Sequence, residues 1–189
     1  MRLSTTPLAL ILALAAPAAL APAVIAQEKT VEVGGAPMYP SKDIVDNAVN
    51  SKDHTTLVAA VKAAGLVDTL SSAGPFTVFA PTNAAFSKLP AGTVDNLVKP
   101  ENKATLTKIL TYHVVAGRMT AVDLMKAVKE GEGTAKLKTV AGADIWVKQA
   151  GPGKLSVTDA KGGTSMVTIG DVLQSNGVIH VIDTVLLPM

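Results

Sequence analysis

The stretch FTVFAPTNAAF at residues 76–86 decides how this chain folds. Its first five residues are rich in β-formers and predict a strand that ends at Pro81, because proline has no N–H to donate to a sheet. Thr82 or Asn83 can then cap a helix that carries Phe86. The stretch therefore predicts a strand that turns directly into a helix and places an aromatic side chain in the core.

Helical patterns lie on both sides of this stretch. Apolar periodicity predicts helices over residues 43–50, 53–65, 83–89, 93–98 and 100–110. Asp53 is a suitable N-cap for the second of these helices, and Gly65 is a suitable end. A strand is predicted over 112–116. Thr120 with Asp123 three residues later resembles a capping box and predicts a further helix to about residue 130.

The last third of the chain changes to the two-residue period of strands. Alternating segments predict strands at 136–139, 144–148, 154–158 and 166–169. Glycine-rich turns separate them, so they should pair as an antiparallel meander. Residues 178–187 are apolar on both faces and indicate a strand that is covered on both sides. Helices come first and strands later, so the predicted fold class is α+β.

Composition excludes several classes of protein. Of the 189 residues, 48% are apolar and 17% are charged, which is typical of a folded domain rather than a disordered chain. The absence of cysteine excludes a disulfide scaffold, a cysteine-ligated metal site and thiol catalysis. Six aromatic residues and a formal net charge of +2 leave little with which to bind nucleic acid.

Motifs for catalysis are missing as well. No G-x-S-x-G elbow or P-loop occurs, and the Gly-Pro-Gly-Lys run at 151–154 is explained better by a hairpin turn. His54, His113 and His180 lie far apart in the sequence and lack the spacing of a metal-binding helix. We therefore expect no enzyme, no cofactor and no metal, and a structural role for each histidine.

The N-terminal segment indicates export. Arg2 precedes an uncharged apolar run over 8–26 with small residues at its end, which predicts a signal peptide of residues 1–26 and cleavage before Gln27. A retained membrane anchor is the competing interpretation, because the run is nearly long enough to span a bilayer. Residues 27–41 contain two glycines and two prolines and predict a flexible leader, with the domain over 42–189.

Three segments of the chain resemble the signature segments of the fasciclin domain family, in the family's order and spacing. They are residues 76–86, Tyr112-His113-Val114-Val115, and NGVIHVIDTVLLP at 176–188. One departure is the pair Ala84-Ala85, where many members have an acidic residue. The resemblance covers 42–189 and implies a wedge of two β-sheets with helices packed around it.

The resemblance also implies a function. It suggests a secreted, non-enzymatic adhesion module, extracellular or periplasmic, that binds matrix, a cell-surface protein or a polysaccharide, with the membrane involved only through an uncleaved signal segment. The alternative is a carrier of an apolar small molecule such as a carotenoid or lipid, because some fasciclin-like proteins bind carotenoids. Six methionines and few aromatics fit that alternative, although methionine is also an ordinary core residue.

Four candidate binding residues follow from the resemblance. The family's Tyr-His pair and an Asp-Ile pair before the last strand are implicated in receptor binding. Tyr112-His113 match the first, and Asp171-Val172 resemble the second with Val in place of Ile. The competing interpretations are structural: a buried, hydrogen-bonded imidazole for His113, and for Asp171 an N-cap on a short turn at 172–175.

Overall fold

The computed structural model describes residues 30–189, so the predicted signal peptide and the first residues of the predicted leader lie outside the described residues. Helices come mainly from the first two thirds of the chain: α1 Ile44–Ala48, η1 Lys52–His54, α2 Thr55–Ala64, α3 Val67–Ser71, α4 Asn83–Ser87, α5 Thr93–Leu97, η2 Pro100–Asn102, α6 Lys103–Tyr112 and α7 Ala121–Glu130. The strands are β1 Val31–Val33, β2 Ala36–Met38, β3 Phe76–Pro81, β4 Val114–Ala116, β5 Thr134–Lys138, β6 Asp144–Gly151, β7 Lys154–Thr158, β8 Thr164–Gln174 and β9 Gly177–Ile182.

Seven strands form one strongly bent sheet in the order β4-β3-β9-β8-β7-β6-β5. The long strand β8 belongs to both halves of it: its start pairs with β7, and the rest pairs with β9. An isolated bridge between Val115 and Thr139 brings the two ends of the sheet together, so the sheet nearly closes. This architecture confirms the predicted α+β class and the wedge of two β-sheets.

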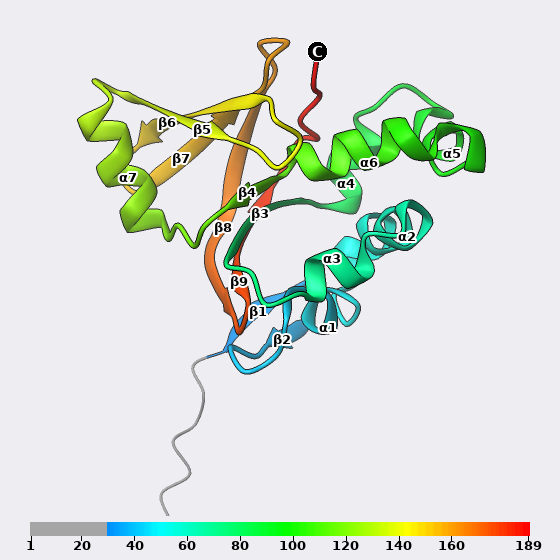
Figure 1. Ribbon diagram of the computed structural model, residues 1–189. Coiled ribbons are helices and arrows are strands. Elements are labelled where there is room, and N and C mark those ends of the chain that lie inside the picture. Colours follow the sequence, from blue (N-terminus) through cyan, green and yellow to red (C-terminus); the bar gives the residue numbers. More distant parts are fainter. Residues whose placement is uncertain (1–29) are drawn as a thin grey trace, which may run out of the picture.

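Each half of the sheet has its own hydrophobic core. Helices α1 to α4 and α6 cover β3, β9 and part of β8 and bury the first core, which includes Val78, Ile179 and Val181 (Figure 1). Helix α7 covers β5, β6 and β7 on the opposite side and buries the second core, which includes Phe79 and Ile182. Strand β9 is buried on both faces, as the sequence predicts, because it lies between the two cores.

Local signals place several helix ends, but the predicted N-cap of α2 is wrong, because Asp53 lies within η1 and His54 occupies the N-cap position. Gly65 follows α2 with φ of 70°, the left-handed conformation that favours glycine at a helix end. Thr120 and Asp123 form the predicted capping box at the start of α7. The turn at 151–154 joins β6 to β7 as a hairpin, which confirms the structural interpretation of that run.

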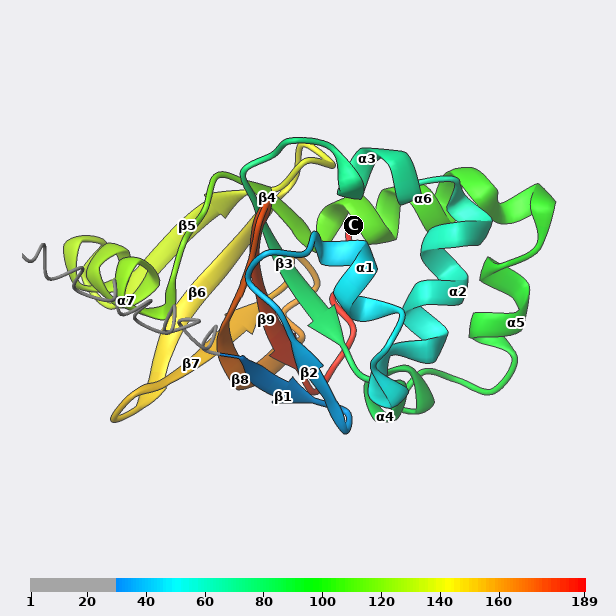
Figure 2. The ribbon, with the colours of Figure 1, turned by 90° about the horizontal axis from the view of Figure 1, so that it is seen from below.

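The predicted flexible leader is wrong for residues 31–38. Strands β1 and β2 pair as a hairpin across Gly34 and Gly35, which have φ of 61° and 74°. Val33 and Met38 are buried in the first core, and the hairpin lies against β8 (Figure 2). The domain therefore includes the hairpin and begins before Lys42.

Several other boundaries differ from the predictions, and one helix is absent from them. The strand expected over 112–116 begins at Val114, because α6 continues through Tyr112. The last strand ends at Ile182 rather than near 187. Helix α3 was not predicted, since its single turn is too short for a clear periodicity.

Candidate functional site

The four candidate residues lie at two junctions of the fold. Tyr112 is the last residue of α6, and His113 leads from it into β4. Asp171 and Val172 lie in β8, at a shift in the pairing register with β9. Asp171 has φ of 55°, an uncommon conformation outside glycine. Both junctions are places where the backbone changes direction.

Tyr112 is fully buried in the second core. Its hydroxyl donates to the carbonyl of Asp144 at 2.8 Å and accepts from the N–H of Ala160 at 2.9 Å. Burial raises the pKa of Tyr112, and the Ala160 N–H opposes this rise. The phenol therefore joins the end of α6 to β6 and to the turn between β7 and β8, and it is closed to direct contact with a partner.

His113 is also buried, and both ring nitrogens are hydrogen-bonded to backbone. Nδ1 lies 2.8 Å from the carbonyl of Ile109, and the N–H of Leu186 donates to Nε2 at 2.9 Å. A carbonyl can only accept and an N–H can only donate, so Nδ1 carries the proton and Nε2 does not. Burial lowers the pKa of His113 to about 4, so the ring is neutral near pH 7. This geometry supports the structural interpretation of His113.

Asp171 is a helix cap, but for a different helix from the one expected. Its Oδ1 accepts from the N–H of Ala121 at 2.6 Å, at the first residue of α7. The turn expected at 172–175 does not exist as such, because β8 continues to Gln174. A carboxylate at the N-terminus of a ten-residue helix is favourable, since it meets free N–H groups and the positive end of the helix dipole.

His180 supports the same junction from β9. The ring is buried, its Nε2 lies 2.9 Å from the carbonyl of Met119, and the N–H of Asp171 donates to Nδ1 at 3.4 Å. The ring also stacks on Phe79 with centroids 5.7 Å apart. Burial lowers the pKa of His180, which agrees with a neutral ring that donates through Nε2.

The four candidates do not form one surface. Tyr112, His113 and Val172 are at most 3% exposed, and Val172 faces the first core while Tyr112 faces the second. Asp171 alone among them is partly accessible. Among these four residues only Asp171 can reach a partner directly, whereas Tyr112 and His113 hold the junction of α6 and β4 and Val172 packs into the first core.

The Thr-Asn pair of the first signature segment caps two helices at once. The hydroxyl of Thr82 accepts from the N–H of Ala85 in α4, as predicted. The amide oxygen of Asn83 accepts from the N–H of Thr56 at 3.0 Å, and its amide nitrogen donates to the carbonyl of Lys52. Asn83 therefore fixes the start of α2 from 27 residues away, a contact that the local sequence does not reveal.

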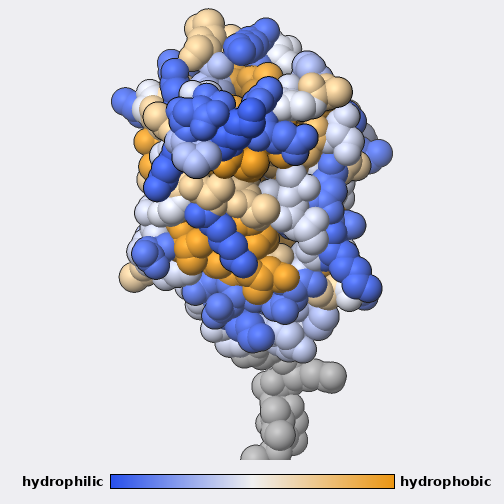
Figure 3. All heavy atoms as spheres, turned by 90° about the vertical axis from the view of Figure 1, so that its right-hand side faces the viewer, coloured by the Kyte–Doolittle hydropathy of each residue, from blue (hydrophilic) through white to orange (hydrophobic). Residues whose placement is uncertain are grey.

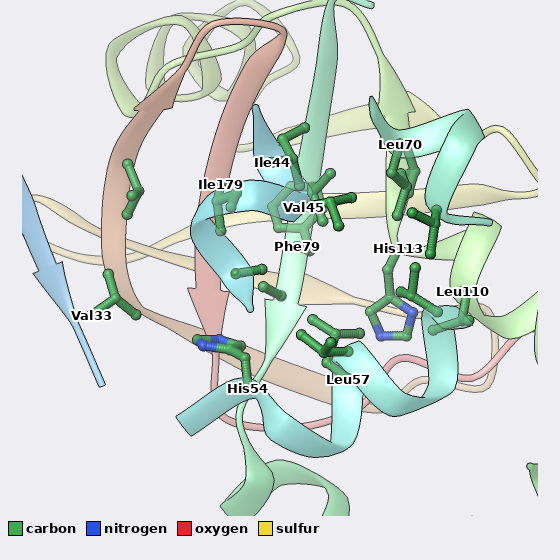
Figure 4. Close-up of a pocket in the computed structure, with 18 of the residues that line it drawn as sticks. Val33, Ile44, Val45, His54, Leu57, Leu70, Phe79, Leu110, His113 and Ile179 are labelled. Carbon is green, nitrogen blue, oxygen red and sulfur yellow. The ribbon is translucent and has the colours of Figure 1, made fainter. Parts of the chain in front are cut away.

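The structure also contains an apolar cavity that sequence reasoning missed. Its volume is about 50 Å³, and it lies between α2, the α1–α3 segment and the sheet (Figure 4). Helix α2 contributes Leu57, Val58 and Val61, whose spacing predicts only a face turned toward the core. Periodicity identifies the buried face of a helix, but it does not show whether the side chains packed opposite that face leave a cavity.

His54 is the polar residue at one side of this cavity. Its side chain is buried, and Nδ1 lies 2.9 Å from the hydroxyl of Ser51. Nε2 has no hydrogen-bond partner among the described residues. Burial lowers the pKa of His54; the backbone of Ala80 and the carboxylate of Asp53 oppose this effect, but neither satisfies Nε2.

Two kinds of feature are absent from the described part of the chain. Within residues 30–189, no group of three or more His, Asp or Glu side chains is placed to hold a metal ion. In the same residues, no helix combines the length and the apolar character needed to cross a membrane. The features that remain are the Asp171 junction and the apolar cavity.

A bent α+β wedge with a helical layer over one half and a single helix over the other defines the structural class. The sequence profile of the fasciclin domain matches residues 52–188, and the chain belongs to the fasciclin domain family. The resemblance of the three signature segments is thereby confirmed.

Individual relatives agree with this assignment. The chain is 50% identical over 161 residues to "Protein sll1483" of Synechocystis sp., which covers 85% of this chain and 82% of that protein. It is also 44% identical to "Cell surface glycolipoprotein MPB83" of Mycobacterium bovis over 123 residues. The aligned region covers 65% of this chain and 48% of that protein. The solved structure of a FAS1 domain pair from the insect cell adhesion molecule Fasciclin I has the same fold, with a TM-score of 0.69, 24% identity, and coverage of 79% of this chain and 52% of that one.

Proposed function

We propose that this protein is an exported, non-enzymatic adhesion module that binds a protein or polysaccharide of a matrix or cell surface. Family membership is the observation that carries the proposal, since the related proteins include a cell surface glycolipoprotein and a cell adhesion molecule shares the fold. The fold alone does not define a function, so the proposal needs a site. Asp171 is the contact residue that we propose, because it is the accessible member of the four candidates.

A binding assay with matched variants tests this proposal. We expect attachment to a matrix or cell-surface preparation to fall at least tenfold in Asp171→Ala. Asp123→Ala is the control. Asp123 also caps α7, because its carboxylate accepts from the N–H and the hydroxyl of Thr120, and it carries the same charge as Asp171. Both variants lose a cap worth about 1 kcal/mol, so a shared effect on the fold would appear in both.

Salt separates specific contact from general attraction. The screening length of electrostatic interactions falls from about 10 Å at 0.1 M salt to about 3 Å at 1 M salt. Exposed charges therefore lose most of their long-range effect. We expect the parent protein to stay attached at 1 M NaCl. Attachment that salt abolishes, together with equal behaviour of the two variants, would contradict an adhesive site at Asp171.

Export is the second part of the proposal. The apolar run before Gln27 favours cleavage by a signal peptidase. We expect intact-mass measurement of the exported protein to give a chain that starts near Gln27. Recovery of the uncleaved chain in the membrane fraction would favour the anchor instead.

A carrier of an apolar small molecule is the second candidate function, and the cavity beside α2 is the observation that favours it. The cavity walls are almost entirely apolar side chains. A volume of about 50 Å³ is well below the roughly 150 Å³ of a cavity that holds benzene, so the enclosed part would hold a short group or one end of a longer molecule.

A further inference from the structure

Residues along one face of α2 line the cavity. His54, Leu57, Val58, Val61 and Lys62 line it, with spacings of three, four, seven and eight residues from the first. These positions share one helix face, and eight residues of helix rise about 12 Å. The lining of the cavity therefore follows one face of α2, from His54 just before the helix to Lys62 in its last turn, and we call this cavity the channel.

The channel reaches the surface between the helices. Val45, Val58 and Val67 are partly exposed and come from α1, α2 and α3, while Lys62 is exposed. Figure 3 shows a hydrophobic patch in the lower half of the helical face, crossed by hydrophilic side chains. A small molecule can therefore enter from solvent without displacing a strand.

His54 is the one imidazole in this channel with an unused nitrogen. His113 also lines the cavity, but both of its nitrogens are occupied by backbone partners. Figure 4 shows the two rings on different sides of the cavity, with Leu57 between them in that view. A buried nitrogen without a partner is unfavourable, and a ligand atom that bonds to it would recover part of that cost.

We propose that this channel binds a short, neutral, apolar molecule with one oxygen, such as an aliphatic alcohol or ketone, and that Nε2 of His54 hydrogen-bonds to that oxygen. The inference rests on the carrier function and names the chemistry of its ligand. Neutrality follows from the walls: apart from His54 they offer no partner to a charge at the buried end, and an unpaired buried charge is strongly unfavourable.

The test uses 1-hexanol as the probe and hexanoate as the charged comparison, both titrated into the full exported protein at pH 7.5. Imidazole ¹⁵N resonances report the site directly, and the resonances that are missing in His54→Phe identify His54. We expect 1-hexanol to shift the Nε2 resonance of His54 while those of His113 and His180 stay in place. Hexanoate should bind at least tenfold more weakly.

Three variants separate the walls from the hydrogen bond. Ala48→Leu adds three carbon atoms to a lining position and should abolish binding, whereas Ala63→Leu adds the same atoms to the exposed face of α2 and should bind like the parent. His54→Phe should weaken 1-hexanol about tenfold, the value of one hydrogen bond.

Each contrary result overturns a defined part of the inference. Equal binding of 1-hexanol to His54→Phe and the parent, with no shift of the His54 resonance, would reject the hydrogen bond and leave an apolar carrier. Tighter binding of hexanoate than of 1-hexanol would place the polar end at Lys62 instead. Absence of binding by either probe at millimolar concentration would reject both the inference and the carrier function.

Discussion

Lowering the pH from 7 to 4 is expected to reduce the free energy of unfolding by at least about 3 kcal/mol, before most carboxylates are protonated. The main cause is His113, whose pKa burial lowers from 6.5 to about 4. One pKa unit corresponds to about 1.4 kcal/mol, so this single ring accounts for about 3 kcal/mol. Burial lowers the pKa of His54 and His180 as well, and they act in the same direction.

The sign follows from which state binds the proton. Above pH 6.5 the ring is neutral in both the folded and unfolded chain, so it adds no pH dependence. Below pH 6.5 the unfolded chain takes up a proton that the folded chain does not, and stability falls as pH falls. The loss ends near pH 4, where the folded ring also becomes protonated. A second proton on His113 would face the N–H of Leu186, which explains why the folded state resists it.

Carboxylates act in a lower window. Burial works against ionisation of Asp183, but bonds from the Met166 N–H, the Thr184 and Ser165 hydroxyls and Lys88 lower its pKa below 3.8. Its contribution is present above pH 3.8 and is lost as pH falls further. Between pH 6.5 and 4 the histidines therefore dominate.

Urea unfolding at pH 7.0, 5.5 and 4.0 measures the effect. His113→Gln removes the titrating ring, so we expect this variant to be less stable at pH 7 but to lose about 3 kcal/mol less than the parent on acidification. The same stability of the parent at pH 7 and pH 4, or an identical pH slope in His113→Gln, would show that His113 does not resist protonation in the folded state.

Signals that lie within a few residues predicted much of the fold. The strand-to-helix change at 76–86 depends on Pro81 and the Thr82 cap, which are adjacent, and the capping box of α7 spans four residues. The hairpin at 31–38 also had a local signal, since Gly34-Gly35 between alternating residues is typical of a tight β-turn. Pro37 lies within β2 and argues against this hairpin, because proline is uncommon inside strands.

The candidate site was much less predictable, since its contacts join distant parts of the chain. Asp171 caps a helix that begins 50 residues earlier, and only the path of β8 brings the two together. The cavity beside α2 depends on how far the opposite wall stands from Leu57 and Val61, which no spacing in the sequence encodes. Residue types at 112, 113, 171 and 172 could be identified from family resemblance, but their burial could not.

Tyr112→Ala is expected to lower the free energy of unfolding by about 3–5 kcal/mol, the usual cost of removing a large buried ring. The phenol is fully buried in the second core. Tyr112→Phe keeps the ring and removes the hydroxyl. It leaves the Asp144 carbonyl and the Ala160 N–H without their shared partner, so we expect a loss of about 1–3 kcal/mol.

The second tyrosine of the chain provides the matched control, and binding provides the second measurement. Tyr39 is 38% exposed, so Tyr39→Phe should change stability by less than about 0.5 kcal/mol. A structural Tyr112 predicts that Tyr112→Phe lowers the urea midpoint and that, below the transition, the folded protein still attaches like the parent. A contact role predicts the reverse: an unchanged midpoint with lost attachment. That reverse result would mean that the end of α6 opens to expose the phenol, and the adhesive surface would then extend from Asp171 toward the second core.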